Sequence, residues 1–258
     1  RRPGVVLLAR DRLDGLDHRD WQRAVEIGVD EVVSLPEQEA WLGQRLTDAV
    51  EGSECRAVVV GVVGGRGGAG ASSLAVALGM VAHRDGLSTV LVDADPMSGG
   101  LDLALGGEDV TGVRWADLQA ADGRISPRVL WDALPRPEGL PVVSGGREGP
   151  RTIPAKAMQA VLSATRRACD LVVVDLPRYV DEATEEALAQ CSTTLLLVPA
   201  EIRAVAAARR VADIVIPLAP DVRVAVRGPA PAGLRASDVA STIGLPLAGD
   251  MPPERWPE

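Results

Sequence analysis

Residues 61–73 read GVVGGRGGAGASS. An apolar run precedes this stretch, and an apolar segment with helical spacing follows it. A glycine-rich loop between a strand and a helix points free backbone N–H groups at an anion, and the helix dipole adds to the attraction. The stretch therefore predicts a phosphate-binding loop.

Two phosphate-loop templates fit the same glycines. Gly65, Gly70 and Ser72 match G-x-x-x-x-G-K-[ST], although Ala71 stands where the template has lysine. Gly65, Gly67 and Gly70 also match the dinucleotide pattern G-x-G-x-x-G. The glycines alone do not separate a nucleoside-triphosphate site from a dinucleotide site.

Acidic residues at the ends of apolar runs favour the nucleoside triphosphate. Asp93 and Asp95 follow TVLV, and Asp175 follows LVVV. A carboxylate at the end of a buried strand beside a phosphate loop orients Mg²⁺, directly or through water, whereas hydride transfer needs no such group. Asp93 also lies about 20 residues after Gly70, where a dinucleotide fold places its ribose-binding acid. An NAD(P)-binding Rossmann protein therefore stays open as the weaker alternative.

Predicted strands and helices alternate along the chain, which is typical of a parallel sheet covered on both faces. Runs such as AVVVGVV and TTLLLV are apolar without alternation, as strands buried on both faces are. We expect strands near 5–9, 31–35, 57–63, 88–93, 140–144, 170–175, 193–198, 222–227 and 246–248. We expect helices near 19–27, 37–50, 71–84, 113–120, 126–133, 155–168, 181–190, 201–214 and 235–243.

Composition narrows the function classes. The net charge of the 258-residue chain is −9, which argues against a nucleic-acid partner. Lys156 is the only lysine, so no other lysine of the same chain can serve the loop. Three cysteines lack metal-ligand spacing, as expected in a reducing cytosol. No apolar run approaches the roughly 18 residues of a membrane span.

A polar break, EGSEC at 51–55, separates two parts of the chain. Before it lies a strand–helix–strand–helix unit, and after it begins the strand that carries the loop. We expect a small N-terminal fragment at 1–52 and a main domain at 56–258. Both ends of the sequence look cut from a longer protein.

The loop resembles the deviant Walker A motif of the ParA/MinD superfamily, whose pattern is K-G-G-x-G-K-[ST]. Arg66 takes the place of the first, signature lysine, and Ala71 that of the second. The resemblance implies a P-loop three-layer α/β/α fold that binds ATP or ADP with Mg²⁺. The nucleotide-binding residues that it implies are Gly65, Arg66, Gly67, Gly68, Ala69, Gly70, Ala71, Ser72, Ser73 and Arg227.

The resemblance also implies roles in chemistry. Ser72, Asp93 and Asp175 would be on the metal side, and Asp95 would orient the attacking water in any hydrolysis that survives. In the family, the signature residue reaches across a dimer into the partner's site, and Arg66 would do so here. Losing one well-placed phosphate contact costs about 3–4 kcal/mol in the transition state, so Ala71 indicates weak or absent hydrolysis, that is, a pseudo-ATPase.

Further segments narrow the resemblance. Three segments look like those of actinobacterial septum-site-determining proteins, relatives of CpaE and TadZ. They are DADPMSGGLDLALG at 93–106, GVRWADL at 112–118 and the segment 224–250. The N-terminal unit resembles the second half of a CheY-like receiver domain. Leu35 replaces the lysine of the usual Lys-Pro pair. The unit is thus expected to be a partial pseudo-receiver.

The resemblance implies a localisation or regulatory protein that acts in septum-site determination or in positioning Tad-type pilus or secretion systems. Expected partners are a second copy of the chain and proteins of the division site or Tad system. The expected location is the cytoplasm, including peripheral association with the inner face of the plasma membrane at a pole or septum. Alternatives are an active ATPase that uses Arg66 and a DNA-segregation protein in which Arg203, Arg209 and Arg210 form a basic helix face.

Overall fold

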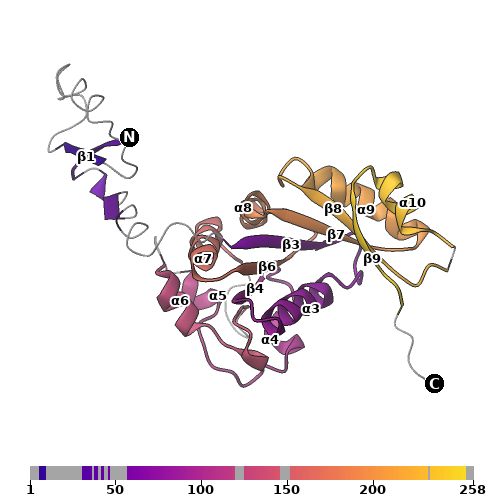
Figure 1. Ribbon diagram of the computed structural model, residues 1–258, viewed down its shortest axis with the longest axis horizontal. Coiled ribbons are helices and arrows are strands. Elements are labelled where there is room, and N and C mark those ends of the chain that lie inside the picture. Colours follow the sequence, from indigo (N-terminus) through magenta and orange to yellow (C-terminus); the bar gives the residue numbers. More distant parts are fainter. Residues whose placement is uncertain are drawn as a thin grey trace, which may run out of the picture. The chain divides into compact units, whose positions relative to one another are not determined.

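The chain divides into two compact units, Arg1–Glu54 and Cys55–Glu258. Figure 1 shows the computed structural model with its labelled elements. The residues that the structure describes are 6–9, 31–36, 38–39, 42–43, 46, 57–119, 125–145, 152–231 and 233–253.

The first unit contains a parallel pair of strands. Strand β1 (Val6–Ala9) runs beside β2 (Glu31–Ser34), as the apolar runs near 5–9 and 31–35 predict. Val33 is fully buried, and half-buried Leu35 follows the end of β2. The helix expected over 19–27 lies outside the described residues, as does most of the helix expected over 37–50.

The second unit contains a seven-stranded sheet in which every recorded pair of neighbours is parallel. The strand order is β5-β4-β6-β3-β7-β8-β9, so the strand that carries the loop lies at the centre. The strands are β3 (Val58–Gly64), β4 (Thr89–Asp93), β5 (Val142–Val143), β6 (Leu171–Leu176), β7 (Thr193–Pro199), β8 (Val222–Arg227) and β9 (Leu247–Met251). This confirms the predicted α/β fold with a mostly parallel sheet.

Helices connect successive strands. They are α3 (Ala71–Arg84), α4 (Leu101–Ala104), α5 (Trp115–Leu118), α6 (Pro127–Ala133), α7 (Ala155–Ala168), α8 (Glu182–Gln190), α9 (Ile202–Val215) and α10 (Ala236–Ile243), with a 3₁₀ turn η2 at Pro137–Gly139. All but α4 and η2 match an expected helix. α4 has four residues and η2 three, too few to give a helical period by themselves, whereas the equally short α5 lies within the longer segment expected over 113–120.

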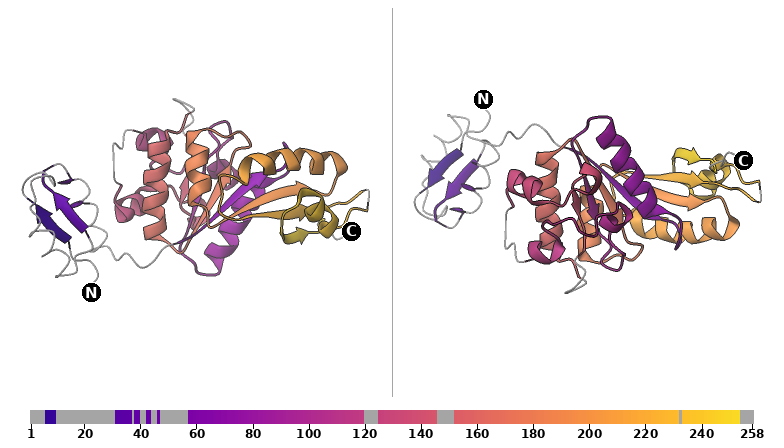
Figure 2. Two further views of the ribbon diagram at one scale, coloured as in Figure 1. Left: turned by 90° about the horizontal axis from the view of Figure 1, so that it is seen from above. Right: turned by 90° about the horizontal axis from the view of Figure 1, so that it is seen from below.

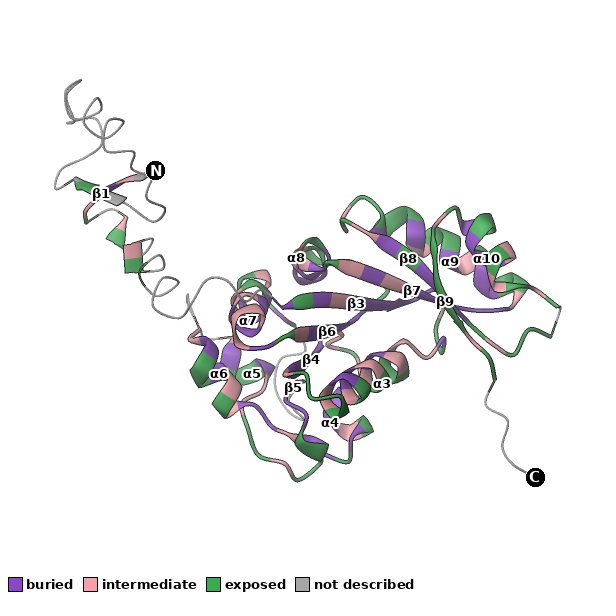
Figure 3. Ribbon diagram, in the orientation of Figure 1, coloured by how far each residue is buried: buried purple, intermediate pink, exposed green. Residues whose placement is uncertain are grey.

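The apolar core has two parts, one on each face of the sheet. On one face, residues of α3 and α4 pack on β3, β4 and β6. On the other, residues of α5 to α10 form the larger cluster. Figures 1 and 2 show α3 and α4 on the opposite side of the sheet from α7 and α8. The central strands are therefore covered on both faces, whereas β9 at the edge is largely exposed (Figure 3).

The register of the sheet brings the sequence-predicted acids to one level. Asp93 of β4 pairs with Asp175 of β6, and Asp175 also pairs with Val62 of β3. Gly64, at the end of β3, pairs with Leu197 of β7. The carboxyl ends of these parallel strands meet where the glycine-rich loop leaves the sheet, which is the usual place for a ligand in such folds.

Candidate functional site

The glycine-rich loop spans residues 65–70, between β3 and α3. Gly68 and Gly70 have φ angles of 70° and 96°, in the left-handed region that side chains disfavour. Gly70 is the N-cap residue of α3; no side chain caps this end, and the first turn holds no acidic residue. The first N–H groups of α3 therefore lack a side-chain acceptor, and the positive end of the helix dipole faces the loop.

A cavity of about 330 Å³ lies over this loop. The loop and α3 line one side, and the ends of β4 and β6 supply the other. The lining residues are Gly64, Arg66, Gly67, Gly68, Ala69, Gly70, Ala71, Ser72, Asp95, Asp175, Leu176, Pro177 and Arg178. Four of the residues expected at the site, namely Gly65, Ser73, Asp93 and Arg227, are not in this lining.

Gly65 has a packing role. Its N–H donates to the carbonyl of Leu197 at 2.8 Å. A methyl group built on Gly65 would lie 2.6 Å from Cβ of Ala208 in α9 and 3.3 Å from that residue's Cα. The glycine lets the loop approach α9 closely, since a side chain there would push the two apart.

Ser72 and Asp175 form the part of the site best suited to a cation. Asp175 is 3% exposed, and its carboxylate hydrogen-bonds the Ser72 side chain. Burial raises the pKa of Asp175 to about 6; the bond to Ser72 opposes this shift, and the nearby charge of Asp95 adds to it. Mg²⁺ prefers one or two carboxylates together with phosphate and water oxygens. Within the described part of the chain, no group of three His, Cys, Asp or Glu side chains could hold a metal without such additional ligands.

The carboxylate of Asp93 is engaged beside the cavity. Its Oδ1 accepts the N–H of Asp95 at 3.1 Å, and its Oδ2 accepts the Ser98 hydroxyl at 2.6 Å and the Leu101 N–H at 3.1 Å. Asp93 thus fixes the segment that follows β4 and the start of α4. The metal role expected for Asp93 stays a prediction. Asp95 lines the cavity instead, with its Oδ1 accepting the Met97 N–H at 2.9 Å.

Two of the arginines near the loop are held by partners within the chain. Nη2 of Arg66 lies 2.9 Å from Oε1 of Glu201, the N-cap residue of α9, while its Nε is buried without a hydrogen-bond partner among the described atoms. Nη1 of Arg227 donates to the Ala69 carbonyl at 2.9 Å and so braces the loop from β8. This contact gives Arg227 a loop-supporting role. Its expected contact with a nucleotide stays a prediction.

Arg178 lines the cavity, although the sequence did not single it out as a site residue. It follows the segment Asp175–Leu176–Pro177 at the end of β6. An arginine three residues after the strand-end Asp175 was the signal in the sequence that could have identified it.

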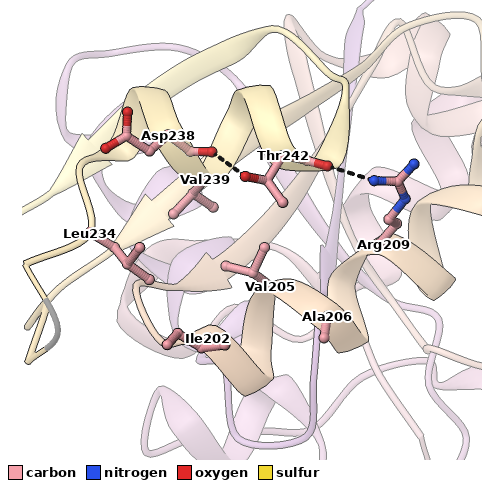
Figure 4. A pocket seen from close by; sticks show the side chains of 8 residues that line it. All are labelled: Ile202, Val205, Ala206, Arg209, Leu234, Asp238, Val239 and Thr242. Carbon is pink, nitrogen blue, oxygen red and sulfur yellow. Dashed lines mark hydrogen bonds between the residues drawn. The ribbon is translucent and has the colours of Figure 1, made fainter.

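A second, more apolar cavity of about 410 Å³ lies between α9 and α10. Figure 4 shows Val205 and Val239 at its centre and Arg209 at its rim, where Nη1 donates to the Thr242 carbonyl at 3.0 Å. It shares no lining residue with the loop cavity. Its lining is mainly aliphatic, so the loop cavity is the better candidate for an anionic ligand.

The free energy of unfolding is expected to rise as the pH is lowered from about 8 to about 5. Burial raises the pKa of Asp93 to about 7 and that of Asp175 to about 6, from an ordinary value of 3.8. In this range the folded chain binds protons that the unfolded chain does not, so protonation favours folding. Each additional proton bound by the folded chain raises the free energy of unfolding by at most about 1.4 kcal/mol for each pH unit.

Urea unfolding at several pH values measures this dependence. Asp175→Asn removes the group with the pKa of about 6, so the part of the stability increase that comes from its protonation should disappear. An Asp175→Asn slope equal to that of the unsubstituted chain below about pH 6 would contradict the assignment.

The chain is similar to known proteins in both of its units. Residues 1–57 match a family described as "Rv3660c-like, CheY-like N-terminal domain". An uncharacterized protein of Mycobacterium tuberculosis, Rv3660c, is 43% identical over 235 residues, which cover 90% of this chain. The chain spans 65% of the length of that relative. A putative septum site-determining protein MinD of Nephroselmis olivacea is 27% identical over 212 residues, covering 78% of this chain and 75% of that protein.

Solved structures share the fold of the second unit. A ParA family ATPase from Chlorobium tepidum superposes with a TM-score of 0.70 at 15% identity, covering 78% of this chain and 86% of that one. The septum site-determining protein MinD of Pyrococcus horikoshii, complexed with Mg-ADP, superposes with a TM-score of 0.63 at 18% identity, covering 76% and 81%. The described residues include no helix with the length and apolar character needed to span a membrane.

Proposed function

We propose that the chain is a ParA/MinD-like nucleotide-binding positioning protein that holds Mg²⁺ with ATP or ADP and hydrolyses ATP weakly or not at all. One observation carries the proposal. The uncapped start of α3, the Ser72–Asp175 pair and Asp95 face one cavity, in which Ala71 occupies the lysine position. Backbone N–H groups and the helix dipole attract phosphate without a lysine.

The same cavity explains why hydrolysis would be weak. Phosphoryl transfer is catalysed by positioning and by neutralising charge on the phosphate oxygens. Ala71 brings no charge to the first turn of α3, and Arg66 is bonded to Glu201. Ser72 and Asp175 would hold Mg²⁺, which would neutralise phosphate charge, while Asp95 would orient water. Affinity would therefore be reduced less than turnover.

The biological role is proposed from the similarity to septum site-determining proteins. We place the protein in septum-site determination or in positioning Tad-type pilus or secretion systems, with division-site or Tad-system proteins as partners. It would work as a homodimer in the cytoplasm and associate peripherally with the inner face of the plasma membrane. In the dimer, Arg66 would leave Glu201 and reach the partner subunit's phosphates. The N-terminal unit would be a partial pseudo-receiver used for protein contacts, since Leu35 cannot bind phosphate as lysine does.

A working ATPase that uses Arg66 is the second candidate. The observation in its favour is that Arg66 lines the cavity and keeps a positive charge at the loop. Phosphate release by the Arg66→Ala variant separates the two candidates. Authentic multiple turnover that disappears in Arg66→Ala would favour the working ATPase.

Titration of the purified chain with a fluorescent ATP analogue, with and without Mg²⁺, tests nucleotide binding. We expect saturable Mg²⁺-dependent binding and slow or undetectable phosphate release. Ser72→Ala should weaken the Mg²⁺-dependent part roughly ten- to a hundredfold, as when one hydrogen bond to a charged group is lost. Ser237→Ala is the matched control, because Ser237 is exposed on α10 and lies outside the cavity. The absence of binding at saturating Mg²⁺ would refute the proposal.

A further inference from the structure

Arg178 lies over the glycine-rich loop from the opposite wall of the cavity. It follows buried Pro177 at the end of β6, close in sequence to Asp175. A methyl group built on Gly67 would lie 3.4 Å from Nη2 of Arg178 and 3.7 Å from its Cζ. The guanidinium therefore rests against the loop backbone, and the glycine at residue 67 leaves room for it.

The donors of this guanidinium are available. Among the described residues, the structure records no hydrogen bond or ion pair for Arg178, whereas Arg66 is paired with Glu201 and Arg227 with the Ala69 carbonyl. Of the three arginines around the loop, Arg178 is thus the one whose N–H groups can turn to a ligand without breaking a recorded contact.

The chemistry of the group matches what the cavity lacks. A guanidinium presents N–H donors in a planar fork that binds two oxygens of a phosphate at once and keeps its charge at every physiological pH. The carboxylates of Asp95 and Asp175 already favour a cation, so a polyphosphate needs positive charge from the protein as well as from Mg²⁺. Ala71 cannot supply this charge, whereas Arg178 lines the same cavity as Ala71 and Ser72.

We infer that Arg178 binds the terminal phosphates of the nucleotide and so replaces the lysine that the loop template has at the position of Ala71. This inference rests on the proposed function. The positive charge then comes from the loop after β6 instead of from the first turn of α3. Arg178 is a phosphate-binding residue in this account, and the phosphate-binding loop is rebuilt from two segments of the chain.

Titration with a fluorescent ATP analogue in Mg²⁺ tests the inference on Arg178→Ala, Arg178→Lys and the control Arg128→Ala. Arg128 is 91% exposed on α6 and lies outside the cavity. We expect Arg178→Ala to weaken binding roughly ten- to a hundredfold and to reduce its salt dependence, while Arg178→Lys keeps part of the affinity and Arg128→Ala keeps all of it. The double variant Ala71→Lys/Arg178→Ala should regain affinity, because it returns a cation to the same cavity.

Each outcome decides one claim. If the unsubstituted chain binds and Arg178→Ala binds equally well, the inference is wrong and the proposed function stands. If the unsubstituted chain does not bind at all, both fail. If Arg178→Ala loses affinity and neither Arg178→Lys nor Ala71→Lys/Arg178→Ala recovers it, Arg178 has a structural role and the inference is wrong. Thermal melting of each variant shows whether the fold is intact.

Discussion

Ala71→Lys is expected to raise the rate of Mg-ATP hydrolysis by about two to three orders of magnitude. Residue 71 is the first residue of α3 and lines the loop cavity, so a lysine there can extend toward the phosphates. A fixed cation at the phosphates stabilises the charge that develops in the transition state, and contributors of this kind are worth about a hundred- to a thousandfold in rate. Steady-state phosphate release at saturating Mg-ATP measures the effect.

Ala71→Met is the matched control, because methionine adds length without charge. It should leave the rate where it is in the unsubstituted chain. If Ala71→Lys binds nucleotide well yet gains no activity, the missing charge at residue 71 does not limit hydrolysis. The position of Asp95 or the absence of a dimer would then become the leading explanation.

Trp115→Ala is expected to lower the free energy of unfolding by about 3–5 kcal/mol, as other large-to-small core substitutions do. Trp115 is 3% exposed in α5, within the larger core cluster. Its Nε1–H donates to the Asp93 carbonyl at 2.7 Å, and its backbone N–H donates to the Ser144 carbonyl at 3.1 Å. Trp115 therefore ties the end of β4, which carries the acidic segment of the site, to the residue after β5.

Trp115→Phe isolates the hydrogen bond from the packing. It should cost about 1–3 kcal/mol, because the buried carbonyl of Asp93 loses a donor, and it should weaken Mg-dependent nucleotide binding through the loosened segment. Trp131→Phe is the control, because Trp131 is half-buried and lies outside the site. Cζ of Arg136 lies 4.8 Å from the centroid of its ring. Urea unfolding measures both. If Trp115→Phe costs no more than Trp131→Phe, the bond to Asp93 does not stabilise the fold.

The strands were the easiest feature to predict. Parallel strands covered on both faces give continuous apolar runs, and β3, β4, β6 and β7 all lie within one or two residues of their predicted bounds. The edge strand β9 continues to Met251, beyond its predicted end at 248, because its exposed residues carry no such run. The expected helices of the second unit were found for the related reason that each has an apolar face against the sheet.

The loop itself was also determined locally. Gly68 and Gly70 take the left-handed backbone that their residue type allows, and Ser72 and Asp175 meet as the strand-end pattern indicated. Asp93 was harder to predict. Its carboxylate accepts N–H groups of its own segment through the turn after β4, and its distance from the loop in the sequence does not determine this turn.

The sheet, the glycine-rich loop and the loss of its lysine can be predicted from the amino-acid sequence, because periodicity and glycine spacing act over a few residues. The contacts of the arginines depend on the tertiary fold. Arg66 meets Glu201 across 135 residues, and Arg227 meets Ala69 across 158. Long side chains with many rotamers find their partners through packing between distant segments. That packing leaves the guanidinium of Arg178 against Gly67, in the lining of the cavity that also includes Ala71.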